Sequence, residues 1–345
     1  MNFFGLPVSV GSDDVGFVTM AAQSLSFFVD QKSQSRVFTG SRSITVRFET
    51  RKLCDPHEAT KGMSRIGNSA FVQDGSYLYF YGHLMVRSTW GEQGLEVVAQ
   101  HYGKPGLKGL IRRTALLGPY LNGRNAFLYI RYLILFPVFM MMELEKKISL
   151  LHGSAVNIGG KGVIFAGLAS VGKSLLATAL TMDHDCKFCA DNFVLFDKEY
   201  VYPLPEFIRL SLDAKKRINN VERLGRVILS RYDRDYYSMK RPMVSGSVKP
   251  ELLFILTRSQ RTEVKSMEAA WALDQVLLAN DHVREFPQHH LAGLLQFMNE
   301  NVCNLYEERM GTFKEMLNKV RIFKLGVGDS FRPADDVRNV IDKVL

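Results

Sequence analysis

Cysteine is scarce in this sequence, with four in 345 residues. A small secreted scaffold held together by disulfides needs more of them at close spacing, so the sequence excludes that class. The first residues, MNFFGLPVSVGSDDVG, carry no basic group ahead of their apolar residues and reach two aspartates early, which does not fit a signal peptide. We therefore expect a protein of the reducing cytoplasm.

Long uncharged apolar runs are also missing. The most apolar stretch, residues 126–142 (AFLYIRYLILFPVFMMM), is short for a bilayer span and contains Arg131 and Pro137. This composition predicts a buried helix and no membrane span.

Charge of one sign is not gathered into blocks. Lys and Arg number 44 against 35 Asp and Glu, which gives a net charge of +9, but the basic residues are scattered. An excess of this kind suits nucleic acid, an anionic membrane, or an acidic or phosphorylated substrate, and by itself selects none of them. No nucleic-acid-binding module is recognisable, so the sequence does not favour nucleic acid as a partner.

The pattern along the chain changes near residue 150. Before it, short β-prone runs at 24–29, 43–49 and 76–81, and a hairpin around 91–94, are separated by Gly, Ser and Asp. After it, apolar strands alternate with amphipathic helices, which is typical of an α/β domain. We predict a small β-rich α+β domain over residues 1–147 and an α/β nucleotide-binding domain over residues 148–345.

Residues 230–241 (SRYDRDYYSMKR) are dense in Arg, Tyr and Asp. The pattern predicts an exposed loop. Two roles stay open for it: closure over a substrate, or a solvated connection between elements.

The strongest motif is GLASVGKS at residues 167–174, which matches the phosphate-binding pattern G-x-x-x-x-G-K-S. An apolar run at 162–166 predicts a strand before it, and SLLATAL from Ser174 predicts a helix after it. Backbone N–H groups and the positive end of the helix dipole then surround one anion. The motif predicts binding of ATP or GTP with Mg²⁺ through Gly167, Ser170, Val171, Gly172, Lys173, Ser174 and Leu175.

Two acids are candidates for the metal beside this loop. Asp191 precedes the apolar run that follows the loop helix, and Asp197 ends that run. Phosphate-loop enzymes in general hold Mg²⁺ with an aspartate at the end of such a strand, which favours Asp197.

A resemblance to a known family favours Asp191 instead. Residues 151–197 resemble the HPr kinase/phosphorylase family and, more broadly, the HPr-kinase-related P-loop serine kinases found with peptide-modifying gene clusters. The similarity includes an H-G-x-x-V strand (His152 to Val156), a G-x-G-V-I strand (Gly160 to Ile164), the phosphate loop, and Ala190-Asp191-Asn192 where the family has A-D-D.

The resemblance implies an HPr-kinase-type P-loop domain with a mixed sheet. It also implies transfer of a γ-phosphoryl group to a hydroxyl, most often serine, of a peptide, a protein or a small molecule. Asp191 would be the general base, His152 would lie beside the γ-phosphate, and Arg209 would neutralise the transferring group. Ser174, Asp191 and Asn192 would hold Mg²⁺. The HPr enzymes are hexamers, and for this chain a homo-oligomer stays open.

Two departures from the family pattern leave a second function open. Asn192 replaces the second aspartate and removes a charge from the metal site. Leu168 and Ala169 replace the usual loop interior. The alternative is a regulatory or defence module that binds or hydrolyses a nucleotide without passing phosphate to a substrate.

Overall fold

The structure is a computed structural model. It describes residues 1–25, 42–66, 70–73, 75–81, 84–102, 129–183, 186–204, 208–218, 227–231, 234–237, 243–281, 302–328 and 332–345. The chain divides into two compact units, Met1–Lys146 with Pro287–Leu305 and Lys147–Phe286 with Tyr306–Leu345. The assignment of residues 1–147 and 148–345 to separate domains stays a prediction.

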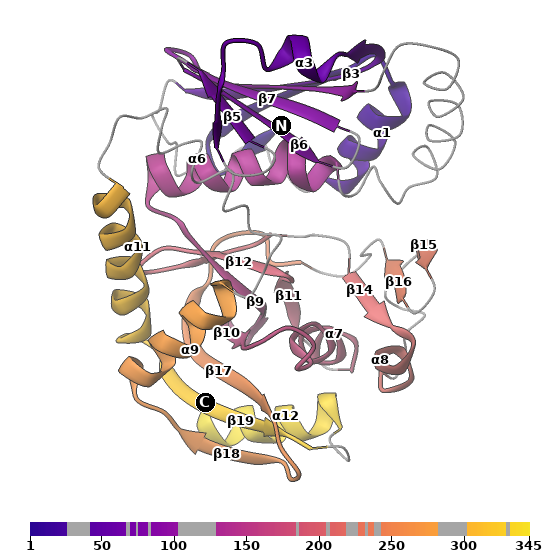
Figure 1. Cartoon of the computed structure of the whole chain (residues 1–345). Coiled ribbons are helices and arrows are strands. Elements are labelled where there is room, and N and C mark those ends of the chain that lie inside the picture. The colour runs from indigo at the N-terminus through magenta and orange to yellow at the C-terminus, as the bar shows by residue number, and fades with distance from the viewer. Residues whose placement is uncertain are drawn as a thin grey trace. The chain divides into compact units, whose positions relative to one another are not determined.

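The described part of the first unit is built on one mixed sheet in the order β1-β2-β3-β8-β7-β6-β5-β4, with β2, β3 and β8 parallel and the other neighbours antiparallel (Figure 1). The strands are β1 (Asn2–Phe3), β2 (Leu6–Ser12), β3 (Ser43–Cys54), β4 (Ser64–Ile66), β5 (Ala70–Gln73), β6 (Ser76–Tyr81), β7 (Leu84–Gly91) and β8 (Gly94–Tyr102).

The strands predicted at 43–49 and 76–81 and the hairpin around 91–94 are confirmed as β3, β6 and β7–β8. The strand predicted at 24–29 is wrong at its start, because Ser24 ends helix α1 (Val15–Ser24), and residues 26–29 lie outside the described residues. Asp14 caps this helix by accepting from two backbone N–H groups of its first turn, a local signal that outweighs β-propensity.

Helices cover the apolar side of this sheet. The ring of Phe17, from α1, lies edge-on to Phe48 of β3 with centroids 4.9 Å apart, and Phe48 also meets Tyr129 at 5.5 Å. Tyr129 leads into a buried helix made of η1 (Arg131–Leu135) and α6 (Phe136–Lys146), as the sequence predicts for this stretch. A short helix, α3 (Pro56–Ala59), completes the described helices of this unit. Among the described helices of the whole chain, none has both the length and the apolar character needed to cross a bilayer.

The second unit contains a second mixed sheet in the order β13-β12-β9-β10-β17-β19-β18, with β11 also paired to β9. Strands β10, β17 and β19 are parallel, and β9 runs antiparallel to β10 and β12. The strands are β9 (Ser149–Ile158), β10 (Lys161–Ala166), β11 (Lys187–Ala190), β12 (Phe193–Phe196), β13 (Val201–Tyr202), β17 (Lys249–Arg258), β18 (Glu263–Ser266) and β19 (Arg321–Val327).

Helices pack on both faces of this sheet (Figure 1). On one face, α7 (Lys173–Asp183) and α12 (Pro333–Val344) share a core with Phe165 of β10 and Phe254 of β17, whose rings stack at 5.9 Å. Successive residues of a strand point to opposite faces, so Ile164 and Leu253 point to the other face. There α9 (Ala269–Asp281) contacts β9 and β17, while α11 (Val302–Leu317) packs Phe313 against Phe196. The chain is thus a mixed α/β protein with mixed sheets.

A third, three-stranded sheet in the order β14-β16-β15 lies in the same unit. Its strands are β14 (Ile208–Ser211), β15 (Val227–Arg231) and β16 (Arg234–Tyr237), and a short helix, α8 (Leu212–Lys216), follows β14. The exposed loop predicted at 230–241 is therefore wrong for residues 230–231 and 234–237. Alternation explains the strand: Asp235 and Tyr237 are buried, and the Lys215 ammonium of α8 lies 3.0 Å from the Asp235 carboxylate.

Candidate functional site

The phosphate-loop motif has the strand–loop–helix setting that its chemistry requires. β10 ends at Ala166 and α7 begins at Lys173, so the loop connects the end of a central strand to a helix N-terminus. A Cβ at Gly167 would lie 2.6 Å from the carbonyl oxygen of Leu256, and its φ of +133° also favours glycine. The loop thus passes closer to its neighbouring strand than any residue with a side chain allows.

Lys173 is folded back into its own loop. Its Nζ donates to the carbonyl oxygens of Gly167 and Leu168, at 2.8 Å each, and the residue is 6% exposed. Burial lowers the pKa of this ammonium to about 8, and the neighbouring Asp191 carboxylate acts against that shift. A phosphate oxygen is a stronger hydrogen-bond acceptor than the two carbonyl oxygens. The Lys173 ammonium can therefore exchange these carbonyls for the phosphate of a bound anion.

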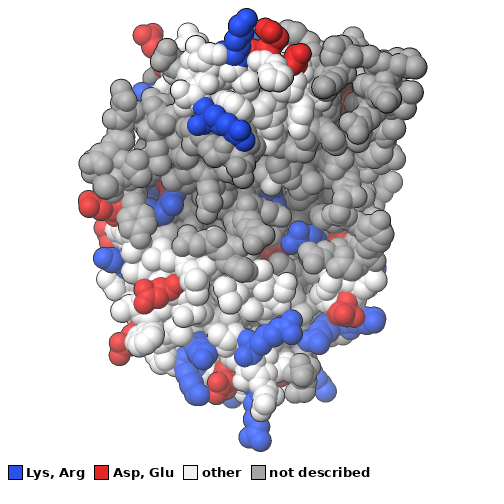
Figure 2. All heavy atoms as spheres, in the orientation of Figure 1, with Lys and Arg blue, Asp and Glu red and all other residues white. Residues whose placement is uncertain are grey.

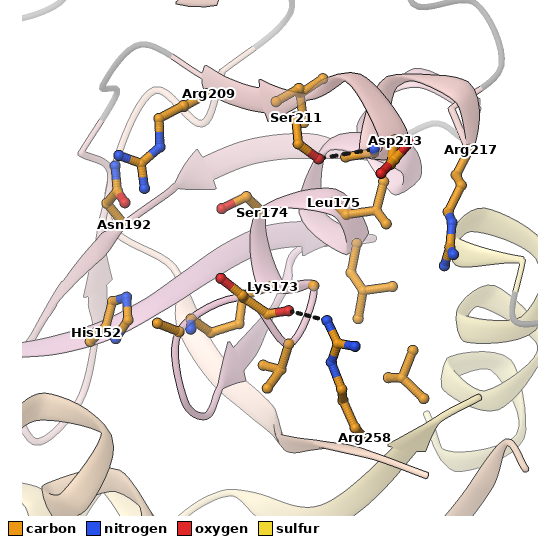
Figure 3. Close-up of a pocket in the computed structure, with 18 of the residues that line it drawn as sticks. His152, Lys173, Ser174, Leu175, Asn192, Arg209, Ser211, Asp213, Arg217 and Arg258 are labelled. Carbon is orange, nitrogen blue, oxygen red and sulfur yellow. Dashed lines mark hydrogen bonds between the residues drawn. The ribbon is translucent and has the colours of Figure 1, made fainter. Parts of the chain in front are cut away.

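The loop borders a cleft of about 620 Å³ in the second unit. Figure 3 shows the labelled side chains that converge on it from β9, α7, β14, α8 and β17. The charged residues of the lining are Lys173, Arg209, Arg217, Arg258 and Asp213. Four cationic groups against one carboxylate favour an anionic ligand.

Of the residues predicted for nucleotide contact, Ser170, Val171, Gly172, Lys173, Ser174 and Leu175 line this cleft, and Gly167 lies at the base of the loop. His152, Asn192 and Arg209 also line it. The structure therefore brings together residues that are up to 57 positions apart in sequence, from His152 to Arg209. Their predicted roles stay predictions.

Asp191 lies behind the lining of the cleft. It is 1% exposed, and its Oδ1 accepts a hydrogen bond from Ser154 Oγ at 2.5 Å. Within the described chain, its Oδ2 is buried and has no hydrogen-bond partner. Buried carboxylate oxygens are nearly always paired, so an unpaired one beside the phosphate-loop lysine calls for a functional explanation.

Strand register separates Asp191 from Asp197. The backbone N–H of Gly153, which pairs with the last residue of β10, donates to the carbonyl oxygen of Asn192. Asp191 therefore lies at the level of the loop. β12 then runs on until Phe196 pairs with Ser149, four residues along β9 and roughly 13 Å further.

Both carboxylate oxygens of Asp197 accept hydrogen bonds from residues that follow it in the chain. Oδ1 accepts from the backbone N–H groups of Glu199 and Tyr200, each at 2.7 Å, and Oδ2 accepts from the Tyr202 hydroxyl at 2.6 Å. These contacts close the hairpin between β12 and β13. Asp197 is not part of the cleft lining.

His152 is held on β9 through its backbone. Its N–H donates to the side-chain oxygen of Asn280 at 2.7 Å, and the Asn280 amide donates to the carbonyl oxygen of Leu150 at 3.0 Å. An amide of helix α9 thus extends the hydrogen-bond ladder of β9 at the point where β10 no longer pairs with it. This fixes the backbone from which the imidazole reaches the cleft.

Asn192 has a left-handed backbone conformation, with φ at +66°. This conformation interrupts the path from β11 to β12 and lets Asp191 and Asn192 face different surroundings: the former is buried and the latter lines the cleft. Asparagine and aspartate tolerate this region better than most residues. Figure 3 shows the Arg209 guanidinium directed toward Asn192.

Sequence reasoning did not identify several residues of the cleft, above all Arg217, Arg258 and Ser211. Arg258 could have been found, because it ends a buried strand parallel to β10 and the carboxyl ends of parallel strands meet at one edge of a sheet. Arg217 and Ser211 reach the cleft because α8 packs on the small sheet, and no motif in the sequence predicts that packing.

The donor set for a metal is small. The described residues contain no group of three or more His, Cys, Asp or Glu side chains placed to hold a metal ion. Mg²⁺ usually binds through one or two carboxylates together with phosphate oxygens and water. The Asp191 carboxylate, the Ser174 hydroxyl and the Asn192 amide are oxygen donors of that kind, with Ser174 and Asn192 in the lining of the cleft and Asp191 behind it.

Comparisons with known proteins add little to this geometry. No model of a known protein family matches the chain, and no curated protein matches it. Among solved structures, the HPr(Ser) kinase/phosphatase from Coxiella burnetii shows a distant structural likeness. It is 11% identical, the match covers 57% of this chain and 98% of that one, and the TM-score is 0.25. A likeness this distant carries no argument about chemistry, so a functional proposal depends on the residues of the chain itself.

Proposed function

We propose that the chain is a nucleotide-dependent kinase that transfers the γ-phosphoryl group of ATP, or of GTP, to a hydroxyl. The acceptor class is serine in a peptide, a protein or a small molecule. Residues 148–345 form the kinase domain and residues 1–147 a separate domain. The observation that carries the proposal is the buried Asp191 carboxylate, which has one oxygen without a partner among the described residues and interacts electrostatically with Lys173.

The phosphate loop and the start of α7 bind the triphosphate. Backbone N–H groups of residues 170–175 surround the phosphates, and Lys173 leaves its two loop carbonyls to bind the β- and γ-phosphates. His152 orients the γ-phosphate from the β9 side. Arg209 neutralises the charge that spreads over the transferring group.

Mg²⁺ would be held by Ser174, Asp191 and Asn192 together with phosphate oxygens. When bound, this ion neutralises charge on the β- and γ-phosphates. Asn192 contributes an oxygen without a charge, so the site has one carboxylate fewer than the family pattern.

In the transfer step, the acceptor oxygen forms a bond to the γ-phosphorus. The bond from that phosphorus to the β,γ-bridging oxygen breaks, and its electron pair leaves with the nucleoside diphosphate. The Asp191 carboxylate accepts the proton of the acceptor hydroxyl, and Ser154 orients it through Oδ1.

The test uses the purified full chain with ATP or GTP labelled at the γ-phosphate and Mg²⁺. The acceptors are free L-serine and a panel of serine-containing peptides. Label should appear as a stable phosphate ester, and both Lys173→Ala and Asp191→Asn should abolish it with the fold intact by circular dichroism. Nucleotide binding without transfer to any acceptor in the panel would reject the kinase assignment.

The alternative is a nucleotide-hydrolysing module without a phosphate acceptor. The observation in its favour is that Asp191 lies behind the lining of the cleft. Release of inorganic phosphate that is lost in Asp197→Ala and retained in Asp191→Ala would support it. The kinase proposal expects the opposite order, because the Asp197 carboxylate is used in the β12–β13 turn.

The net positive charge does not by itself add a nucleic-acid function. Figure 2 shows Asp and Glu side chains interspersed with Lys and Arg on the described part of one face. A nucleic-acid site needs a continuous positive stripe with aromatic or groove-reading groups.

A further inference from the structure

Two arginines lie at one end of the cleft. Arg217 is the C-cap of α8 and Arg258 is the last residue of β17. Both are exposed, and both line the cleft. Figure 3 shows them on the Leu175 side, whereas His152, Asn192 and Arg209 lie together at the other end.

Among the residues that the structure describes, no carboxylate neutralises either arginine. In the described part of the chain, neither forms an ion pair, and the one hydrogen bond from the Arg258 side chain goes to the carbonyl oxygen of Ser170 at 3.5 Å. A guanidinium has five donors and a flat face that stacks on aromatic rings. Most of that capacity is unused here.

The phosphate loop gives a bound nucleotide a direction. The loop lysine reaches the β- and γ-phosphates, and the N–H groups at the helix start hold the α- and β-phosphates. Lys173 lies on the side of His152 and Asn192, so the γ-phosphate belongs to that end (Figure 3). The nucleoside then points away from it, past Leu175, toward Arg217 and Arg258.

The surfaces at this end suit a flat ring. Val171 and Leu175 come from the loop and α7, Ala214 from α8, and Val327 from the end of β19, and all four line the cleft. Apolar side chains together with guanidinium groups form a common setting for a nucleobase, because stacking needs no particular base edge.

We propose that Arg217 and Arg258 form the nucleoside-binding end of the cleft and hold a purine base between the β14–α8 segment and the ends of β17 and β19. A purine fits better than a pyrimidine because its two fused rings offer a larger flat face for stacking on the guanidinium groups. The inference rests on the proposed function only in requiring that the ligand is a nucleotide.

Calorimetric titration of the full chain with ATP, CTP and inorganic tripolyphosphate, each with Mg²⁺, tests this assignment. Arg217→Ala and Arg258→Ala should each weaken ATP binding about tenfold, CTP binding less, and tripolyphosphate binding less than twofold. Arg→Lys at the same positions should lose nearly as much ATP affinity as Arg→Ala, because lysine keeps the charge and loses the flat face. Arg261→Ala is the matched control, since Arg261 is exposed and outside the cleft lining.

Equal losses for ATP and tripolyphosphate would overturn the proposal, because the arginines would then bind phosphate. Full recovery by lysine, or no binding of any of the three ligands to the unchanged protein, would overturn it as well. Failure of the kinase proposal looks different: ATP binds with the expected arginine dependence, but no acceptor is phosphorylated. Active transfer with unchanged ATP affinity in both Arg→Ala variants rejects this inference alone.

Discussion

Ser154 Oγ donates a hydrogen bond of 2.5 Å to Asp191 Oδ1, and both residues are buried. The bond joins β9 to the turn between β11 and β12, two segments 37 positions apart in sequence. It leaves Oδ2 as the one oxygen of this carboxylate that can face a ligand. The serine is thus placed to orient the proposed base without touching the substrate.

Replacing Ser154 with alanine leaves the buried Asp191 carboxylate without its hydrogen-bond donor. We expect a loss of about 1–3 kcal/mol in the free energy of unfolding, measured by urea denaturation, because an unpaired buried acceptor bears its full desolvation cost. In the transfer assay, kcat should fall about tenfold while KM for the nucleotide changes little, since the loop is untouched.

A double-mutant cycle with Asp191→Ala is the control for this prediction. If Ser154 acts through Asp191, Ser154→Ala should cost almost nothing in the Asp191→Ala background. An equal stability loss in both backgrounds would show that Ser154 contributes packing alone.

Lys173 gives a prediction about protons. Because burial lowers the pKa of its ammonium to about 8, about half of the free protein carries a neutral Lys173 at pH 8. A bound triphosphate favours the charged form, so binding at pH 8 should take up about half a proton, and binding at pH 6.5 almost none. Nucleotide affinity should decline as the pH rises above 8.

Calorimetry in two buffers with different ionisation enthalpies measures this uptake. Lys173→Arg is the control, since a guanidinium stays charged across this range and should show no uptake attributable to residue 173. Uptake of the same number of protons per bound nucleotide at pH 6.5 and at pH 8 would contradict the prediction.

The loop, its strand and its helix could be predicted from sequence because each is specified locally. Gly167 and Gly172 mark positive φ values, and the apolar run and helix formers flank them. The sequence offered both Asp191 and Asp197 as candidates beside the loop, and the resemblance alone favoured Asp191. Propensity could not place Asp191 there, because the strand pairing that does so joins β9 to residues thirty or more positions away.

Other features depend on tertiary packing and left no local sign. Arg217 lines the cleft because α8 packs on the small sheet, where Lys215 meets Asp235. Residues 230–231 and 234–237 of the Arg- and Tyr-rich segment form strands of this sheet, although the sequence pattern predicts an exposed loop there. Asn280 supports His152 from a helix 128 positions away, a contact no spacing rule predicts.

The two loop glycines should respond differently to alanine. Gly167→Ala combines a positive φ with a contact of 2.6 Å between Cβ and the carbonyl oxygen of Leu256, whereas a Cβ at Gly172 meets no atom within 4 Å. We expect Gly167→Ala to lower the free energy of unfolding by about 2–4 kcal/mol, from backbone strain together with the close contact. Gly172→Ala should lower it by about 1–2 kcal/mol, from backbone strain alone. Paired urea denaturation curves check the order, and equal losses would mean that the close approach to β17 relaxes freely.

Asn192→Asp tests the proposed metal site by adding a second carboxylate, which the HPr-kinase pattern that residues 151–197 resemble has at this position. Aspartate tolerates the left-handed backbone at residue 192, where φ is +66°, so the fold should be kept. A second carboxylate beside Ser174 should strengthen the hold on a divalent cation, because the number of charged oxygen ligands sets much of the affinity. We expect the Mg²⁺ concentration for half-maximal transfer to fall several-fold at fixed ATP.

Asn192→Ala is the matched variant for that measurement. It removes the oxygen and puts a residue without a polar side chain into the left-handed conformation, so it should require more Mg²⁺ and also lose about 1 kcal/mol of stability. If Asn192→Asp and the unchanged protein give the same Mg²⁺ dependence, residue 192 is not a metal ligand. The cation would then depend on Ser174, Asp191 and the phosphates, and Asn192 would serve the cleft through its backbone turn, which keeps Asp191 buried against Ser154.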